Sequence, residues 1–77
     1  MGGRKPVVSD EEILGVFAAA DDPVLSAPEV AESLPIGETG TYKRLRKLRD
    51  RDLLESKPVG QGVAWWLTDE GEALAGE

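Results

Sequence analysis

The chain contains no cysteine and no histidine among its 77 residues. Without cysteine no disulfide can form, and without either residue the usual zinc sites are excluded. The absence of histidine also removes the imidazole on which many acid–base and nucleophilic mechanisms depend. We therefore expect a protein that is not an enzyme, with no catalytic residue, no metal site and no cofactor.

Long apolar runs are also missing. No stretch approaches the roughly 18 residues that a membrane helix needs, and the amino end, MGGRKP, lacks the apolar stretch of a signal peptide. These absences predict a cytoplasmic protein with no membrane partner. Glycine and proline stay below the share that marks low-complexity chains, so we expect a flexible tail over residues 1–8 and one folded domain over 9–75.

The charges that are present are distributed unevenly. The net charge is −6, yet the segment 43–51 contains six basic residues and one acid, while the rest of the chain contains three basic and fourteen acidic residues. Such an acid excess is common in proteins that work at high salt, which predicts a halophilic source. The basic run is the kind of patch that attracts phosphates, although it could also be a solvated helix face paired with acids elsewhere.

Capping signals predict the starts of two helices. Ser9 precedes Glu12 by three residues and Ser26 precedes Glu29 by three, which is the capping-box spacing. The first helix should end before Pro23 and the second near residue 34. Five apolar residues of the first helix fall on one stripe, namely Ile13, Leu14, Val16, Phe17 and Ala20.

The basic run lies on a third predicted helix, from about 38 to 51. Thr41, Leu45 and Leu48 are spaced i, i+4, i+7 and should face the core, which turns the cations outward. Gly40 costs about 1 kcal/mol against alanine in a helix interior. We interpret it as a point of close backbone contact with the second helix.

Two extended runs, 53–58 and 63–68, are separated by a glycine-containing turn and predict a two-stranded ribbon. Strand alternation puts Trp65 and Leu67 on one face and Trp66 on the other. Trp65 should therefore be in the core, and Trp66 is a candidate interface residue.

Four residues mark the boundaries of these elements. Asp52 tolerates the left-handed turn that should end the third helix, and Pro58 predicts an edge strand or the ribbon tip. Thr68 should cap a short last helix over 69–75, which Gly71 weakens.

The order of these elements resembles the winged helix-turn-helix family. The residues that carry the resemblance are VA at 30–31, LPIGET at 34–39, KRL at 43–45, Leu48 and LL at 53–54. The closing WWLTDEG at 65–71 is similar to the aromatic-x-Leu-Thr-x-x-Gly that follows the wing in MarR-like and archaeal phage-repressor-like regulators. The resemblance implies an α+β fold with a three-helix core, a two-stranded β wing and a short C-terminal helix.

The same resemblance implies a transcriptional regulator that binds double-stranded DNA sequence-specifically, with the helix 38–51 in the major groove. Base readout then falls to Thr39, Tyr42, Lys43 and Arg46. Phosphate contacts fall to Arg44, Lys47, Arg49 and Arg51. The wing offers Lys57 and Gln61 to DNA, and has no arginine at its tip.

Several alternatives stay open at the level of sequence. The domain could be a protein–protein interaction module in a transcription or replication assembly, with its basic helix against an acidic partner and Trp66 buried. Arg49 could pair with Glu11 or Glu12, and Tyr42 could pack beside the second helix. A homodimer is compatible with reading two half-sites.

Overall fold

Two capping boxes set the starts of the first helices. In the computed structural model, which describes residues 8–76, α1 spans Asp10–Ala19 and α2 spans Ala27–Glu32. Ser9 Oγ accepts a hydrogen bond from the Glu12 amide at 3.1 Å, and the Glu12 carboxylate accepts one from the Ser9 amide at 3.1 Å. Ser26 and Glu29 repeat the arrangement before α2. Both predicted starts are confirmed, and α2 ends two residues earlier than predicted.

The third helix buries a narrow stripe. Helix α3 spans Gly37–Asp50, and Thr41, Leu45 and Leu48 on it are fully buried. The predicted inward stripe is therefore confirmed. The interpretation of Gly40 is wrong: a Cβ there would lie 3.6 Å from the side chain of Ile36 in the preceding turn, an ordinary contact, and would meet no atom of α2 within 4 Å.

The sheet has three strands, one more than the predicted ribbon. Strands β2 (Leu54–Val59) and β3 (Gly62–Leu67) form the hairpin, and the short β1 (Leu25–Ser26) pairs with the other side of β3. In both pairs the strands are antiparallel. Pro58 lies on the edge strand β2, as predicted, where a missing N–H is tolerated.

The last helix, α4 (Asp69–Ala75), packs directly on the turn before β2. Thr68 Oγ1 accepts from the Gly71 amide at 3.0 Å and donates to the Asp52 carbonyl at 2.7 Å. Asp52 itself has φ 64°, which confirms the predicted left-handed turn. A Cβ on Gly71 would lie 2.0 Å from the carbonyl oxygen of Leu53. Gly71 is therefore the residue that lets α4 approach, a role that its helix propensity did not reveal.

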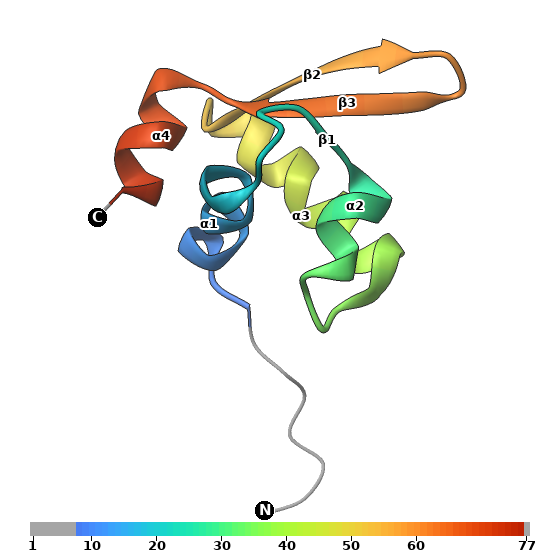
Figure 1. Ribbon diagram of the computed structural model, residues 1–77, viewed down its shortest axis with the longest axis horizontal. Helices are drawn as coiled ribbons and strands as arrows, with labels where there is room; N and C mark the ends of the chain where they lie inside the picture. Colours follow the sequence, from blue (N-terminus) through green and yellow to red (C-terminus); the bar gives the residue numbers. More distant parts are fainter. Residues whose placement is uncertain (1–7, 77) are drawn as a thin grey trace, which may run out of the picture.

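The core lies between the helices and the inner face of the sheet (Figure 1). Trp65 is fully buried there, as predicted, and Trp66 on the other face is half-buried. Val8, which we assigned to the tail, is 4% exposed and belongs to the core, because it enters the molecule just before α1. The rest of the predicted tail, residues 1–7, lies outside the described residues.

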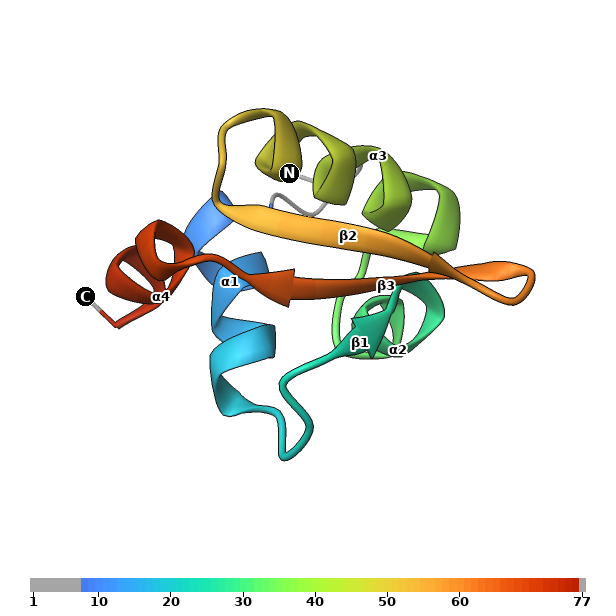
Figure 2. The ribbon, with the colours of Figure 1, turned by 90° about the horizontal axis from the view of Figure 1, so that it is seen from above.

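The arrangement places α3 and the hairpin where they can act together. Figure 1 shows α1, α2 and α3 beneath the sheet, with α4 at one end and the β2–β3 hairpin extending past the helices at the other. Seen from above, α3 runs alongside β2 (Figure 2). In the described part of the chain, no helix is long and apolar enough to cross a membrane.

Candidate nucleic-acid interface

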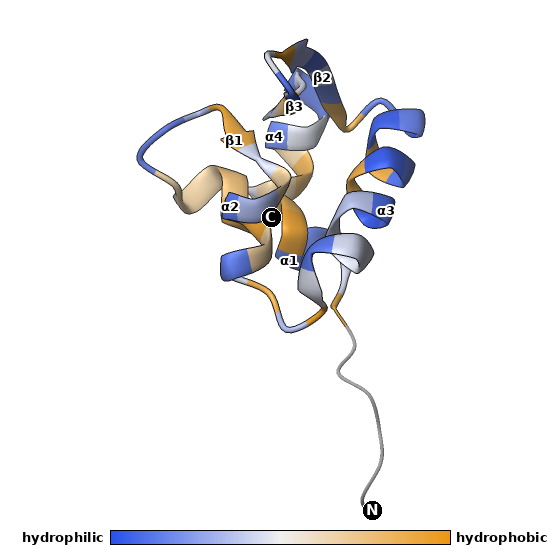
Figure 3. Ribbon diagram, turned by 90° about the vertical axis from the view of Figure 1, so that its right-hand side faces the viewer, coloured by the Kyte–Doolittle hydropathy of each residue, from blue (hydrophilic) through white to orange (hydrophobic). Residues whose placement is uncertain are grey.

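The outward side of α3 is rich in cations that form no ion pair with any other residue of the described range. We use the name α3 ridge for five of its exposed residues: Thr39, Tyr42, Lys43, Arg46 and Lys47. Glu38, Arg49 and Asp50 on the same helix are exposed as well. Within residues 8–76, the acidic side chains form ion pairs with Arg44 and Arg51, and with none of the ridge cations. Figure 3 shows hydrophilic residues along the side of α3 that faces away from the rest of the molecule. The ridge therefore presents positive charge to solvent.

Two other cations of the basic run are held by one acid of α1. Arg44 Nη2 lies 2.7 Å from Asp10 Oδ1, and Arg51 Nη1 lies 2.5 Å from Asp10 Oδ2. The alternative of pairing with the protein's own acids thus holds for these two residues. Contact of Arg44 with phosphate remains a prediction, and it requires competition with Asp10.

Arg49 is tied to the sheet. Its Nη1 donates to Ser56 Oγ at 2.9 Å, and its guanidinium carbon lies 5.5 Å from the ring centroid of Trp65. The anticipated pairing with Glu11 or Glu12 is absent from the ion pairs of residues 8–76, so that alternative is wrong. Arg49 instead links α3 to β2 while its side chain stays exposed.

Tyr42 connects the ridge to the core. Its ring meets that of Trp65 edge-on, with centroids 5.9 Å apart and planes at 83°. The guanidinium carbon of Arg46 lies 5.9 Å from the Tyr42 ring centroid. Tyr42 remains 40% exposed. A guanidinium near an aromatic face is attracted to it and keeps its charge, so Arg46 remains cationic beside Tyr42.

The ridge is hollowed at two points. One hollow, of about 520 Å³, is lined by Ile36, Gly40 and Asp50 together with the cations Lys43, Arg44, Arg46 and Lys47. The other, of about 400 Å³, is lined by Ala27, Glu38, Thr39, Tyr42, Lys43 and Arg46. Gly40, which has no side chain, therefore borders a surface that a partner can approach closely, in place of the contact with α2 that we expected.

The wing is exposed and nearly uncharged at its tip. Lys57 and Gln61 are both exposed, and Val59 beside them is 57% exposed. Gly60 has φ 58°, a conformation that favours glycine. Lys57 is the only cation of the hairpin, so the wing adds little positive charge to the ridge.

The described residues offer no obvious alternative site for chemistry. No group of three or more potential metal ligands occurs within residues 8–76. Trp66, the candidate interface residue, borders a groove on a different side of the molecule.

Comparison with known proteins relates the chain to solved structures. No protein-family model and no curated protein matches the sequence. A variant of ZitR from Lactococcus lactis in complex with DNA superposes with a TM-score of 0.77 at 26% identity, over 99% of this chain and 52% of that one. A variant of MarR from E. coli complexed with operator DNA gives a TM-score of 0.76 at 20% identity, over 87% of this chain and 50% of that one.

A third similar structure is the adhesin competence repressor AdcR from Streptococcus pyogenes, with a TM-score of 0.74 at 20% identity over 87% of this chain and 50% of that one. ZitR is described as a zinc-responsive MarR family member. This chain spans about half the length of the structures it matches. Its residues 8–76 have the winged helix-turn-helix fold of the MarR-family regulators, as the sequence resemblance indicated.

Proposed function

We propose that the chain binds double-stranded DNA sequence-specifically as a transcriptional regulator, with α3 in the major groove. The observation that carries the proposal is the α3 ridge, where Lys43, Arg46 and Lys47 are exposed and form no ion pair within residues 8–76. A major groove about 12 Å wide admits a helix. The DNA complexes of ZitR and MarR, which have the same fold, support the proposal.

In this proposal the ridge divides into two roles. By analogy with the winged-helix family, Thr39, Tyr42 and Lys43 in the first half of α3 meet base edges, together with Arg46 further along the helix. Arg46 and Lys43 can donate to guanine O6 and N7. Lys47 meets phosphate, which gives affinity without sequence information.

The remaining cations of the basic run and the wing contribute less to the proposed DNA affinity. Arg49 keeps its bond to Ser56 and can offer its other N–H groups to a phosphate, because a guanidinium has five donors. Arg44 has the same five donors, but its Nη2 is held by Asp10, so a phosphate there must compete with that carboxylate for the guanidinium. On the wing, Lys57 supplies one phosphate contact and Gln61 can meet the minor groove.

We also propose that two copies of the chain bind one operator in the cytoplasm. Two copies on one operator would read two half-sites about one helical turn apart, as dimeric regulators do. The activity is cytoplasmic and involves no catalytic step. Sedimentation of the chain with duplexes containing one or two half-sites measures the number of copies bound.

A salt titration tests the proposal. The chain is titrated with mixed-sequence duplex at about 50 and about 200 mM salt, because log affinity falls by about 0.9 per neutralised phosphate for each unit of log salt. Amide chemical shifts recorded during the titration should change along α3. Steep loss of affinity at the higher salt is the expected result.

Negligible binding at both salt concentrations would contradict the proposal. It would favour the other class, a winged helix that serves as a protein-interaction module with α3 against an acidic partner and Trp66 buried. The half-buried Trp66 and the exposed ridge are compatible with that role too, so the duplex titration separates the two functions.

A further inference from the structure

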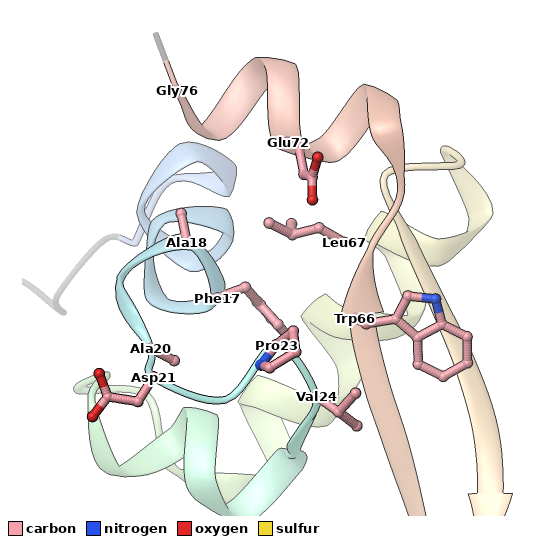
Figure 4. A pocket seen from close by; sticks show the side chains of 10 residues that line it. All are labelled: Phe17, Ala18, Ala20, Asp21, Pro23, Val24, Trp66, Leu67, Glu72 and Gly76. Atoms are coloured by element: carbon pink, nitrogen blue, oxygen red, sulfur yellow. The ribbon is translucent and has the colours of Figure 1, made fainter.

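A groove of about 730 Å³ lies between the end of α1, the loop before β1, the end of β3 and α4. Apolar side chains line most of it, among them Phe17, Pro23, Val24 and Leu67. Val24 is 41% exposed, so part of this apolar lining is open to solvent. Figure 4 shows Asp21 and Glu72 on opposite sides of these apolar side chains.

The acidic border of this groove continues past Trp66. A neighbouring hollow of about 480 Å³ shares Trp66 and Leu67 with the groove and is lined by four further carboxylates. We call the six acids of the two hollows the acidic face: Asp21, Asp52, Glu55, Asp69, Glu70 and Glu72. No described lysine or arginine lines either hollow. Lys57 shares the outer side of β2 with Glu55 but lies nearer the hairpin tip.

The groove is on the far side of the molecule from α3. Figures 2 and 3 both place the loop between α1 and β1 opposite α3. A ligand in the groove would therefore leave the α3 ridge open, and the ridge could be occupied at the same time.

We propose that the acidic face docks a basic amphipathic segment of another protein. Apolar side chains of the segment fill the groove over Phe17, Val24 and Leu67, while its lysines or arginines meet Asp21 on one side and Glu72 on the other. The apolar floor supplies affinity, because burial removes exposed apolar surface from water, and the two acids supply orientation and specificity.

Charge decides between this occupant and a second copy of the chain. The net charge is −6. Two copies facing each other through this groove would bring the carboxylates of both acidic faces together, and like charges in contact are unfavourable. A cationic segment removes that repulsion. The inference goes beyond the proposed DNA contact and does not depend on it, since none of the ridge residues takes part.

Three synthetic peptides of about 15 residues, a length at which helices are marginal in water, test the inference on the ¹⁵N-labelled full chain without DNA. The first has leucine and lysine in amphipathic order, the second has glutamate in place of lysine, and the third has serine in place of leucine. The leucine–lysine peptide should shift the amide signals of Val24, Trp66 and Leu67, and its affinity should fall as salt rises. The other two should bind weakly or not at all.

A pair of charge-reversal variants provides the matched control. The double substitution Asp21→Lys and Glu72→Lys should weaken binding of the leucine–lysine peptide by about tenfold or more, equivalent to about 1.4 kcal/mol. Glu11→Lys with Glu32→Lys makes the same change in net charge on exposed acids outside the acidic face, and should weaken it far less. Circular dichroism checks that both variants are folded.

Four results would overturn the inference. They are equal weakening in both variants, peptide-induced shifts along α3 in place of the groove, equal binding of the leucine–glutamate peptide, and concentration-dependent shifts at Val24 and Trp66 without peptide. The last result would identify a second copy of the chain as the occupant.

Discussion

Asp10 forms ion pairs with two arginines of the basic run. Each of its carboxylate oxygens receives one guanidinium, from Arg44 and from Arg51. The Asp10 side chain is 32% exposed and that of Arg51 is 56% exposed. Solvent therefore screens both pairs, and their joint contribution to stability is modest.

Replacing Asp10 with asparagine should lower the free energy of unfolding by about 1 kcal/mol, because both ion pairs are lost and each exposed pair contributes up to about 1 kcal/mol. Urea unfolding measures the change. Glu11→Gln is the matched control, since Glu11 is also an acid in the first turn of α1 but forms no ion pair within residues 8–76. Equal losses in both variants would show that the helix dipole, and not the pairing with arginine, is responsible.

Gly71 lies so close to the backbone of Leu53 that a larger residue does not fit there. Gly71→Ala would place a Cβ 2.0 Å from the Leu53 carbonyl oxygen. Since the obstructing atom is backbone, α4 or the turn must move, and we expect a loss of about 3 kcal/mol, at the upper end of overpacking costs.

Gly15 serves as the control, because replacing it with alanine should change the stability in the opposite direction. A Cβ on Gly15, inside α1, would meet nothing within 4 Å. Gly15→Ala should therefore stabilise the protein by up to about 1 kcal/mol, the propensity difference between the two residues in a helix. Thermal unfolding of the two variants measures both effects. A stabilising Gly71→Ala would refute the packing of α4 on Leu53.

Among the elements, α3 has its core residues on one side and the residues proposed to bind DNA on the other. Its buried stripe and its cationic ridge lie on opposite sides, so neighbouring residues in the sequence have different tasks. Leu45 is fully buried and Arg46 beside it is exposed. This division makes the proposed function testable with two adjacent substitutions.

Arg46→Ala should reduce DNA affinity by about 1–3 kcal/mol, the range for a good base contact, and should hardly change the melting temperature. Leu45→Ala should instead cost about 2–5 kcal/mol of stability, because it opens a cavity in the core. Duplex titration and thermal unfolding measure the two effects. A large loss of stability in Arg46→Ala would mean that the ridge is part of the folded core.

Arg51→Ala is the matched control on the same basic run. Arg51 is engaged by Asp10, so its removal should reduce DNA affinity less than removal of Arg46. If the two variants lose affinity equally, the ion pairs with Asp10 do not hold in the DNA complex.

At the scale of the whole molecule, the charge is polarised. The α3 side contains six of the nine basic residues of the chain, and the remaining surface is acidic. The acidic excess repels itself, and at long range it also repels DNA. Added salt should therefore increase the stability of the fold and decrease the affinity for DNA.

Raising sodium chloride from about 0.05 to about 1 M, which shortens the screening length from over 10 Å to about 3 Å, should raise the melting temperature. The same change should lower DNA affinity, because the counterions released on binding gain less entropy when the surrounding salt is more concentrated. Thermal circular dichroism and duplex titration measure the two quantities. A falling melting temperature would show that the ion pairs of Asp10 outweigh the acidic repulsion, against the high-salt adaptation that the composition predicts.

The sequence by itself determined the four helices, the hairpin and their buried faces. The capping boxes at Ser9 and Ser26 and the inward spacing of Leu45 and Leu48 are local signals that involve residues within a few positions of each other. Strand alternation likewise separated Trp65 from Trp66. Local signals of this kind act through backbone geometry, so they could be interpreted without knowing the fold.

Only the tertiary structure decided which side chains meet across the chain. Asp10 reaches Arg44 and Arg51 over 34 and 41 residues, and Gly71 contacts the backbone of Leu53. No local pattern encodes these partners, since they depend on how α1, α3 and α4 pack. For the same reason the basic run could be located from the sequence, but its division could not. Three ridge cations form no ion pair among the residues that the structure describes, while Arg44 and Arg51 meet Asp10 and Arg49 meets the sheet, because the helix packs against α1 and β2.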